Sequence, residues 1–186
     1  HNDFLDNGIK IFNEGGEKIS REIEKRIEKY LSSSLISVET SQIGKAYRFD
    51  ESGPRYIEFC KSTVPSDISF SSLRIVVDCA NGACYKVSPE VFEELGAEVI
   101  TIGNKPDGFN INQKCGSTHP EIVKEAVIKH RADFGISLDG DGDRVILVDE
   151  KGSILDGDDL LYILAFANPN RTGPWSGVVG TLMSNI

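Results

Sequence analysis

The sequence is poor in features that mark several large classes of protein. Its 186 residues contain only four cysteines, too few for a disulfide-built scaffold, and no two of them form a C-x-x-C pair. Reduced thiols in a cytoplasmic protein are therefore expected. No apolar run approaches the roughly 18 residues that a membrane-spanning helix needs, and the first residues lack the pattern of a signal peptide.

Positive charge is also scarce. Lys and Arg number 20 against 29 Asp and Glu, which gives a net charge of −9. This balance argues against a nucleic acid or an anionic membrane as the main partner, although a local basic patch can still hold a phosphate. Hydrophobic residues at 39% and charged residues at 26% are typical of a soluble globular protein with enough length for one good core.

The central part of the chain alternates between two patterns. Short runs rich in β-branched and apolar residues predict strands at residues 73–78, 97–102, 133–138 and 144–148. Ser88 as N-cap and Pro89 as first helical residue predict a helix that ends at Gly96, and a capping box at residues 118–121 predicts a second helix. Strands that alternate with helices predict an α/β domain with a mostly parallel or mixed sheet and helices on both faces.

Partial α/β domains are expected on either side. Residues 17–31 carry apolar residues at intervals of four and predict an amphipathic helix, and a short helix is expected around residues 55–61. Further along, a helix is expected at residues 158–167 and a strand at 177–182. Because the chain starts at His1 without a Met, we expect an internal piece of a longer polypeptide. In it, residues 1–64 would end a first domain, 65–155 form a complete second domain, and 156–186 begin a third.

Three aspartates follow one of the predicted strands directly. Asp139, Asp141 and Asp143 lie two residues apart, so in an extended chain their side chains would stand about 6.6 Å from one another. That is too far to share a magnesium ion, whose oxygen ligands lie at about 2.1 Å. Gly140 and Gly142 between them allow the loop to curl until the carboxylates converge. A site made only of oxygen ligands favours magnesium, manganese or calcium over zinc.

Two other interpretations of this loop compete with a magnesium site. The first is a solvated acidic turn without any ion. The second is an EF-hand, because the three aspartates and Glu150 fall at positions 1, 3, 5 and 12 of its calcium loop, but Arg144 occupies position 6, where that loop requires Gly. A cation beside a metal site is suited to holding a phosphate oxygen. A structural salt bridge to a neighbouring aspartate is the alternative role for Arg144.

The loop and several other segments resemble one known family. With its DGDGDR loop at residues 139–144, the chain resembles the α-D-phosphohexomutase superfamily. Four further segments resemble the branch of that superfamily that acts on hexosamine phosphates: HNDFLDNGIK (1–10), VVDCANGA (76–83), PDGFNINQKCGSTH (106–119) and GTLMSN (180–185). Members have four domains around one central site, so the resemblance implies a phosphohexomutase-like fold of which this chain holds the central part.

The resemblance implies an isomerase that converts glucosamine 6-phosphate to glucosamine 1-phosphate through a phosphoserine and a bisphosphate intermediate. It implies that Asp139, Asp141 and Asp143 hold one Mg²⁺ per active site. It also implies catalytic roles for Arg144, which would position a phosphoryl oxygen, and for Lys10 as general acid and base.

In the family, the phosphorylated serine stands immediately before a His-Asn pair, here His1-Asn2, and is therefore absent from this chain. His1 would support the loop of that serine. Asp3 stands where the family usually has Pro, so the shape of this loop is expected to differ. From the residues alone, a solvated surface lysine is the alternative interpretation of Lys10, and a chain end is that of His1.

The expected partner is a hexosamine phosphate, with no nucleic acid and no membrane; a homodimer is also possible. Phosphomannomutase or phosphoglucomutase activity is the second enzyme hypothesis, because these enzymes share the metal loop. A third hypothesis is a metal-binding piece without catalysis, and the isolated chain is expected to be inactive.

Two loop segments leave their roles open. In the long segment of residues 103–117, Asn110, Asn112 and Ser117 are consistent with facing the active site, and equally with stabilising turns. The pair Asn81-Gly82 after the first strand of the central domain is consistent with an anion site, but a tight turn is preferred.

Overall fold

A computed structural model describes residues 2–6, 8–34, 37–166 and 178–184. The chain forms two compact units: Glu51–Ile186 together with His1–Asp6, and Asn7–Asp50. Each unit is described by itself. The expected division into the end of one domain, a complete second domain and the start of a third stays a prediction.

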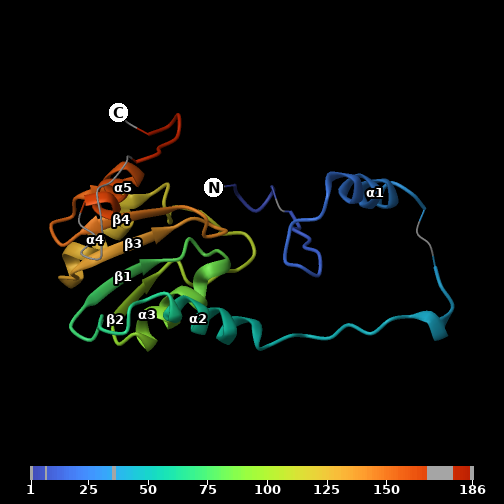
Figure 1. Ribbon diagram of the computed structural model, residues 1–186, viewed down its shortest axis with the longest axis horizontal. Coiled ribbons are helices and arrows are strands. Elements are labelled where there is room, and N and C mark those ends of the chain that lie inside the picture. The colour runs from blue at the N-terminus through green and yellow to red at the C-terminus, as the bar shows by residue number, and fades with distance from the viewer. Residues whose placement is uncertain (1, 7, 35–36, 167–177, 185–186) are drawn as a thin grey trace. The chain divides into compact units, whose positions relative to one another are not determined.

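The larger unit is built on one mixed sheet, shown in Figure 1. Its strand order is β2-β1-β3-β4-β5. Strands β2, β1 and β3 run parallel to one another, β4 is antiparallel to β3, and β5 is antiparallel to β4. The strands are β1 (Arg74–Asp78), β2 (Glu98–Ile102), β3 (Phe134–Leu138), β4 (Val145–Asp149) and β5 (Ile154–Leu155). The four predicted strands are therefore present, and the two-residue β5 is an addition that pairs with β4.

Helices cover both faces of the sheet, as the sequence predicts. Helix α3 (Val87–Glu94) packs on one face, where the buried cluster consists of Ile75, Val77, Cys79, Ala97 and Ile136. Helix α4 (Pro120–His130) packs on the other, where the buried cluster consists of Val76, Val123, Val127, Ala132 and Val148. Because successive residues of a strand point to opposite faces, the run Ile-Val-Val in β1 supplies both clusters and is fully buried.

Two more helices belong to this unit. Helix α2 (Ser52–Ser62) packs beside α3, and Lys61 Nζ lies 2.6 Å from Glu94 Oε2 between them. Helix α5 (Gly157–Phe166) follows β5. None of the helices in the described residues combines the length and the apolarity that crossing a bilayer requires.

Both predicted helix caps in this unit are wrong. Helix α3 begins at Val87, directly after the short 3₁₀ helix η2 (Ala83–Tyr85), so Ser88 lies inside it. Helix α4 begins at Pro120 with His119 as its N-cap residue and no capping side chain. Its start is displaced because His119 N donates to Gly116 O at 2.8 Å, which closes a turn around the expected cap Thr118.

The smaller unit contains helix α1 (Arg21–Leu31), where the periodicity predicts it, with the Ser20 hydroxyl accepting from Ile23 N. It also contains η1 (Thr40–Gln42) and an isolated bridge between Phe12 and Lys18.

The strand predicted at residues 177–182 is wrong for its described part, residues 178–182. Ser184 N donates to Thr181 O at 3.1 Å to make a turn, and no described segment pairs with these residues. A strand requires a hydrogen-bonded neighbour. Residue 177 itself lies outside the described residues.

Candidate metal centre

The topology of the sheet selects one edge for a ligand site. From β1 the chain goes to β2 on one side, and from β2 it crosses to β3 on the other side of β1. The chain leaves β1 towards β2 and leaves β3 towards β4, so the connections from these two neighbouring strands run in opposite directions along the sheet. In open α/β sheets, ligands bind outside the carboxyl ends of the strands at such a switch point. The aspartate loop, residues 139–144, is the one that follows β3.

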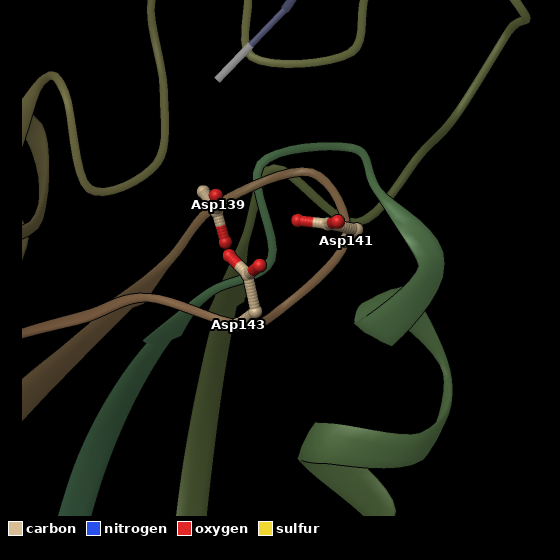
Figure 2. Close-up of side chains that lie close together, drawn as sticks. All are labelled: Asp139, Asp141 and Asp143. Carbon is tan, nitrogen blue, oxygen red and sulfur yellow. The ribbon is translucent and has the colours of Figure 1, made fainter. Parts of the chain in front are cut away.

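The aspartate loop is the turn of a β-hairpin. Leu138 and Val145 form the last pair of β3 and β4, and Gly142 N donates to Asp139 O at 3.0 Å within the loop. Gly142 has a φ of 71°, a left-handed conformation that suits glycine. This curl brings the carboxylates together, so that ligand oxygens of Asp139, Asp141 and Asp143 all lie within 4.8 Å of one another. Figure 2 shows the three carboxylates converging inside the loop.

The three aspartates differ in burial. The Asp139 side chain is 1% exposed and that of Asp143 is 63% exposed. Asp139 Oδ1 accepts a hydrogen bond from Arg144 N at 3.1 Å, and this bond fixes the carboxylate at the base of the loop. The buried carboxylate and its exposed neighbour together offer a hard, all-oxygen donor set that is open to solvent on one side. Such a set fits Mg²⁺, which binds through one or a few carboxylates and keeps waters and phosphate oxygens as its other ligands.

Arg144 makes the salt bridge that is its alternative role. Its Nε lies 3.7 Å from Asp139 Oδ2 and 3.7 Å from Asp143 Oδ1. These distances are longer than those of a close bidentate pair. The Arg144 side chain remains 56% exposed, so a guanidinium anchored at Nε can still present other N–H donors to a ligand.

The loop after β1 packs against the backbone of the aspartate loop. Gly82 N donates to Cys79 O at 2.8 Å, which confirms a tight turn at Asn81-Gly82, and Ala83 N donates to Gly140 O at 2.8 Å. The backbone of Gly82, at φ −102°, is one that any residue adopts. A Cβ at Gly82, however, would overlap the Gly140 carbonyl oxygen and lie 2.6 Å from its carbonyl carbon. Glycine is needed here because two backbones approach closely, not because of its conformation.

Asp78, the last residue of β1, joins the loops around the site. It is fully buried, and its carboxylate accepts hydrogen bonds from Ala80 N at 3.0 Å, Gly116 N at 2.7 Å and Ser137 Oγ at 3.4 Å. These donors belong to the loop after β1, the long loop before α4, and β3. Burial raises the pKa of the Asp78 carboxyl, although the two backbone donors act in the opposite direction.

The long loop, residues 103–117, also lies against the aspartate loop. Ser117 N donates to Leu138 O at 2.9 Å, directly before Asp139. Asn112 N donates to Ala80 O at 2.8 Å, and the Asn112 side chain lies against Gly140. Asn110 instead stabilises its own turn, since its side chain bonds Lys105 O at 3.0 Å and Asp107 N at 3.1 Å.

Comparison with known proteins identifies the family. The sequence profile described as phosphoglucomutase/phosphomannomutase, alpha/beta/alpha domain II, matches residues 54–152, which is more than half of the chain. The chain belongs to this family. Strands β1 to β4, helices α3 and α4 and the aspartate loop all lie within the matched residues.

Curated relatives match this phosphohexomutase chain from end to end. They include proteins named phosphoglucosamine mutase from Thioalkalivibrio sulfidiphilus, 55% identical over 186 residues, from Legionella pneumophila, 57% identical over 185, and from Marinomonas sp., 58% identical over 187. All of this chain is covered in each comparison, but only 41%, 41% and 42% of the respective relative. The chain thus spans about two fifths of the length of these relatives.

Solved structures agree with the fold. A phosphoglucomutase/phosphomannomutase family protein from Burkholderia thailandensis is 29% identical, with a TM-score of 0.52 over 61% of this chain and 25% of its own. A candidate phosphomannomutase from Thermus thermophilus has a TM-score of 0.62 over 82% of this chain and 35% of its own. At 22% identity, the second likeness supports the fold alone.

The structure brings together only part of the site predicted for a phosphohexomutase. Asp139, Asp141, Asp143 and Arg144 share one loop. Lys10 belongs to the unit Asn7–Asp50, which is described separately, and His1 lies outside the described residues, so both catalytic roles stay predictions. Sequence reasoning missed Asp78. The signal that could have found it is a carboxylate that directly follows three buried apolar residues, Ile75, Val76 and Val77, at the end of β1.

Proposed function

We propose that the whole protein is a phosphoglucosamine mutase, which interconverts glucosamine 6-phosphate and glucosamine 1-phosphate. The observation that carries this proposal is the identity of 51–58% to relatives of that name over the entire chain. The converging carboxylates of residues 139–143 support it independently, because phosphoryl transfer depends on neutralising the charge of the moving group.

Under this proposal, Asp139, Asp141 and Asp143 would hold Mg²⁺, which would supply positive charge to the transferring phosphoryl group. Arg144 would bind a phosphoryl oxygen through the N–H donors on its exposed side. The buried Asp139 gives the site a fixed base, while the exposed Asp143 leaves it accessible to a phosphate from solvent.

The remaining steps involve residues outside this loop. A phosphorylated serine immediately before His1 would give its phosphoryl group to a sugar hydroxyl: the P–O bond to serine breaks as that to the sugar forms. Lys10 would take the proton of the attacking hydroxyl and later return it to the serine oxygen. The bisphosphate would then turn over and give its other phosphoryl group back to the serine.

The test uses the full-length protein and three substrates: glucosamine 6-phosphate, glucose 6-phosphate and mannose 6-phosphate. We expect the highest kcat/KM with glucosamine 6-phosphate, loss of activity with EDTA and recovery with Mg²⁺. Asp141→Asn should weaken Mg²⁺ binding by at least about tenfold, since it removes one of three charged ligands. Asp67→Asn, at an exposed carboxylate outside the loop, is the matched control and should bind as wild type does.

Phosphomannomutase or phosphoglucomutase activity is the second candidate, because the matched family profile and the Burkholderia structure carry that description. A higher kcat/KM with mannose or glucose 6-phosphate would select it and reject the amino-sugar assignment. For the 186 residues alone we propose metal binding without turnover, and measurable mutase activity of this chain would overturn that statement. The cytoplasmic location and the homodimer stay predictions.

A further inference from the structure

Residues 2–6, which we call the leading segment, belong to the same compact unit as the sheet. Two contacts from the long loop, residues 103–117, hold this segment. Asn112 Nδ2 donates to the Asn2 carbonyl oxygen at 2.9 Å. The rings of Phe4 and Phe109 meet edge to face, with centroids 5.2 Å apart and an interplanar angle of 77°. Edge-to-face packing at this distance is favourable.

Asn112 touches the aspartate loop and the leading segment with one side chain. A Cβ at Gly140 would lie 2.7 Å from Asn112 Nδ2, so the absence of a side chain at Gly140 lets the amide lie against the backbone between Asp139 and Asp141. The backbone of Asn112 is fixed in turn, because Asn112 N donates to Ala80 O at 2.8 Å. The amide therefore joins Asn2 to the aspartate loop at a defined place.

Asn112 is an unfavourable residue for the stability of the loop alone. Its φ is 56°, in the left-handed region, where glycine is less strained. Its Oδ1 atom is buried and has no hydrogen-bond partner among the described residues. A buried acceptor without a donor is destabilising, and backbone strain of this kind gathers at functional positions. A residue that combines both features is better explained by what its Nδ2 holds than by folding.

Phe109 is prepared for its contact by a local turn. The Asp107 carboxylate accepts from Phe109 N at 2.8 Å and from Asn110 N at 3.0 Å, which fixes the backbone on which the ring stands. Phe109 is 67% exposed and Phe4 is 41% exposed, so the pair contributes little to the core. An exposed aromatic on a fixed turn is suited to positioning a partner ring.

We propose that Asn112 and Phe109 are positioning residues that hold the leading segment beside the aspartate loop during phosphoryl transfer. The inference rests on the proposed function, in which the serine that gives up its phosphoryl group directly precedes this segment. Neither side chain touches the reacting atoms. They set where the segment lies, and a displacement of about 1 Å at a transferring group is enough to lower the rate by about a hundredfold.

The experiment compares two variants of the full-length protein with two matched controls. Asn112→Gly removes the amide and accepts the left-handed backbone, and Phe109→Leu removes the ring edge. Lys114→Gly places the same substitution at another left-handed residue of the loop, at φ 50°. Phe59→Leu changes an aromatic that is 62% exposed on α2.

Asn112→Gly and Phe109→Leu should each lower kcat about tenfold or more, with KM and Mg²⁺ affinity within about threefold of wild type, because only the positioning of the segment changes. Amide hydrogen exchange in residues 2–6 should become faster in both variants and stay unchanged in both controls. Wild-type kcat and exchange in Asn112→Gly and Phe109→Leu would overturn the inference. If the wild-type protein has no activity on glucosamine 6-phosphate, the proposed function fails, and the exchange experiment still decides whether the two residues hold the segment.

Discussion

Gly82→Ala is the substitution that most directly tests how the aspartate loop is built. The backbone of Gly82 suits alanine, so no conformational strain is expected at residue 82 itself. The effect must come from the added methyl group, which would overlap the Gly140 carbonyl oxygen and lie 2.6 Å from the carbonyl carbon. The obstacle is backbone on both sides, so no side chain can rotate out of the way.

The size of the effect follows from this geometry. An ordinary contact between carbon atoms is about 3.5 Å, so the Gly140 peptide must move by about 1 Å. That movement breaks the hydrogen bond from Ala83 N to Gly140 O, worth about 1 kcal/mol, and overpacking adds about 1–3 kcal/mol. We expect the free energy of unfolding to fall by about 2–4 kcal/mol. Metal–oxygen distances tolerate about 0.2 Å, so we also expect Mg²⁺ affinity to fall about 10- to 100-fold.

Two measurements check this prediction on the 186-residue chain: urea unfolding followed by circular dichroism, and calorimetric titration with Mg²⁺. Gly53→Ala is the matched control, because a Cβ at Gly53 in α2 meets nothing within 4 Å. It should leave Mg²⁺ affinity unchanged and leave stability equal or slightly higher, since alanine favours a helix. Wild-type Mg²⁺ affinity in Gly82→Ala would refute the idea that the close approach of these two loops sets the carboxylate geometry.

Three further predictions concern stability. Burial raises the folded pKa of the Asp78 carboxyl, so its contribution to folding is largest below the unfolded value of about 3.9 and is lost as pH rises through the folded pKa. The unfolding free energy of wild type relative to Asp78→Asn should therefore fall as pH rises over this window. A rise would show that the backbone donors outweigh burial. Gly135→Ala should lower the free energy of unfolding by about 1–3 kcal/mol, because its Cβ would lie 2.6 Å and 2.7 Å from methyl groups of Val123 and Val127. Mg²⁺ affinity measured by titration should stay unchanged, and weaker binding would contradict a purely local effect. Arg131→Gly should raise the free energy of unfolding by about 1 kcal/mol, because Arg131 caps α4 in the left-handed conformation, at φ 51°, which glycine adopts without strain. A decrease in the urea midpoint would show that the Arg131 side chain stabilises the fold by more than this strain destabilises it.

The main strands could be predicted because each is encoded by its own residues. The β-branched run of β1 is buried on both faces, and the hairpin of β3 and β4 is marked by apolar runs on either side of the aspartates. The helix caps could not be predicted as well, because the start of α4 depends on a turn that ends at His119. A capping pattern in the sequence has no effect where the preceding backbone is already committed to another hydrogen bond.

The candidate site shows the same division between local and distant information. The convergence of the three aspartates could be predicted, since it depends on glycines inside the same loop. The role of Asp78 depends on Gly116, 38 residues away, and that of Asn112 on Asn2, 110 residues away. No local pattern encodes such contacts. Sequence analysis therefore found the residues suited to bind a metal and missed Asp78, while leaving the role of Asn112 open.

The position of the aspartate hairpin in the chain determines how early in synthesis the three carboxylates are present. All three carboxylates lie between β3 and β4, and the last strand of the sheet ends at Leu155. Every described residue that shapes the loop is therefore translated by that point. A nascent chain that has reached this length already contains the three carboxylates, and an ion that binds them in the folded sheet would stabilise it by mass action while the ribosome is still adding the residues that follow.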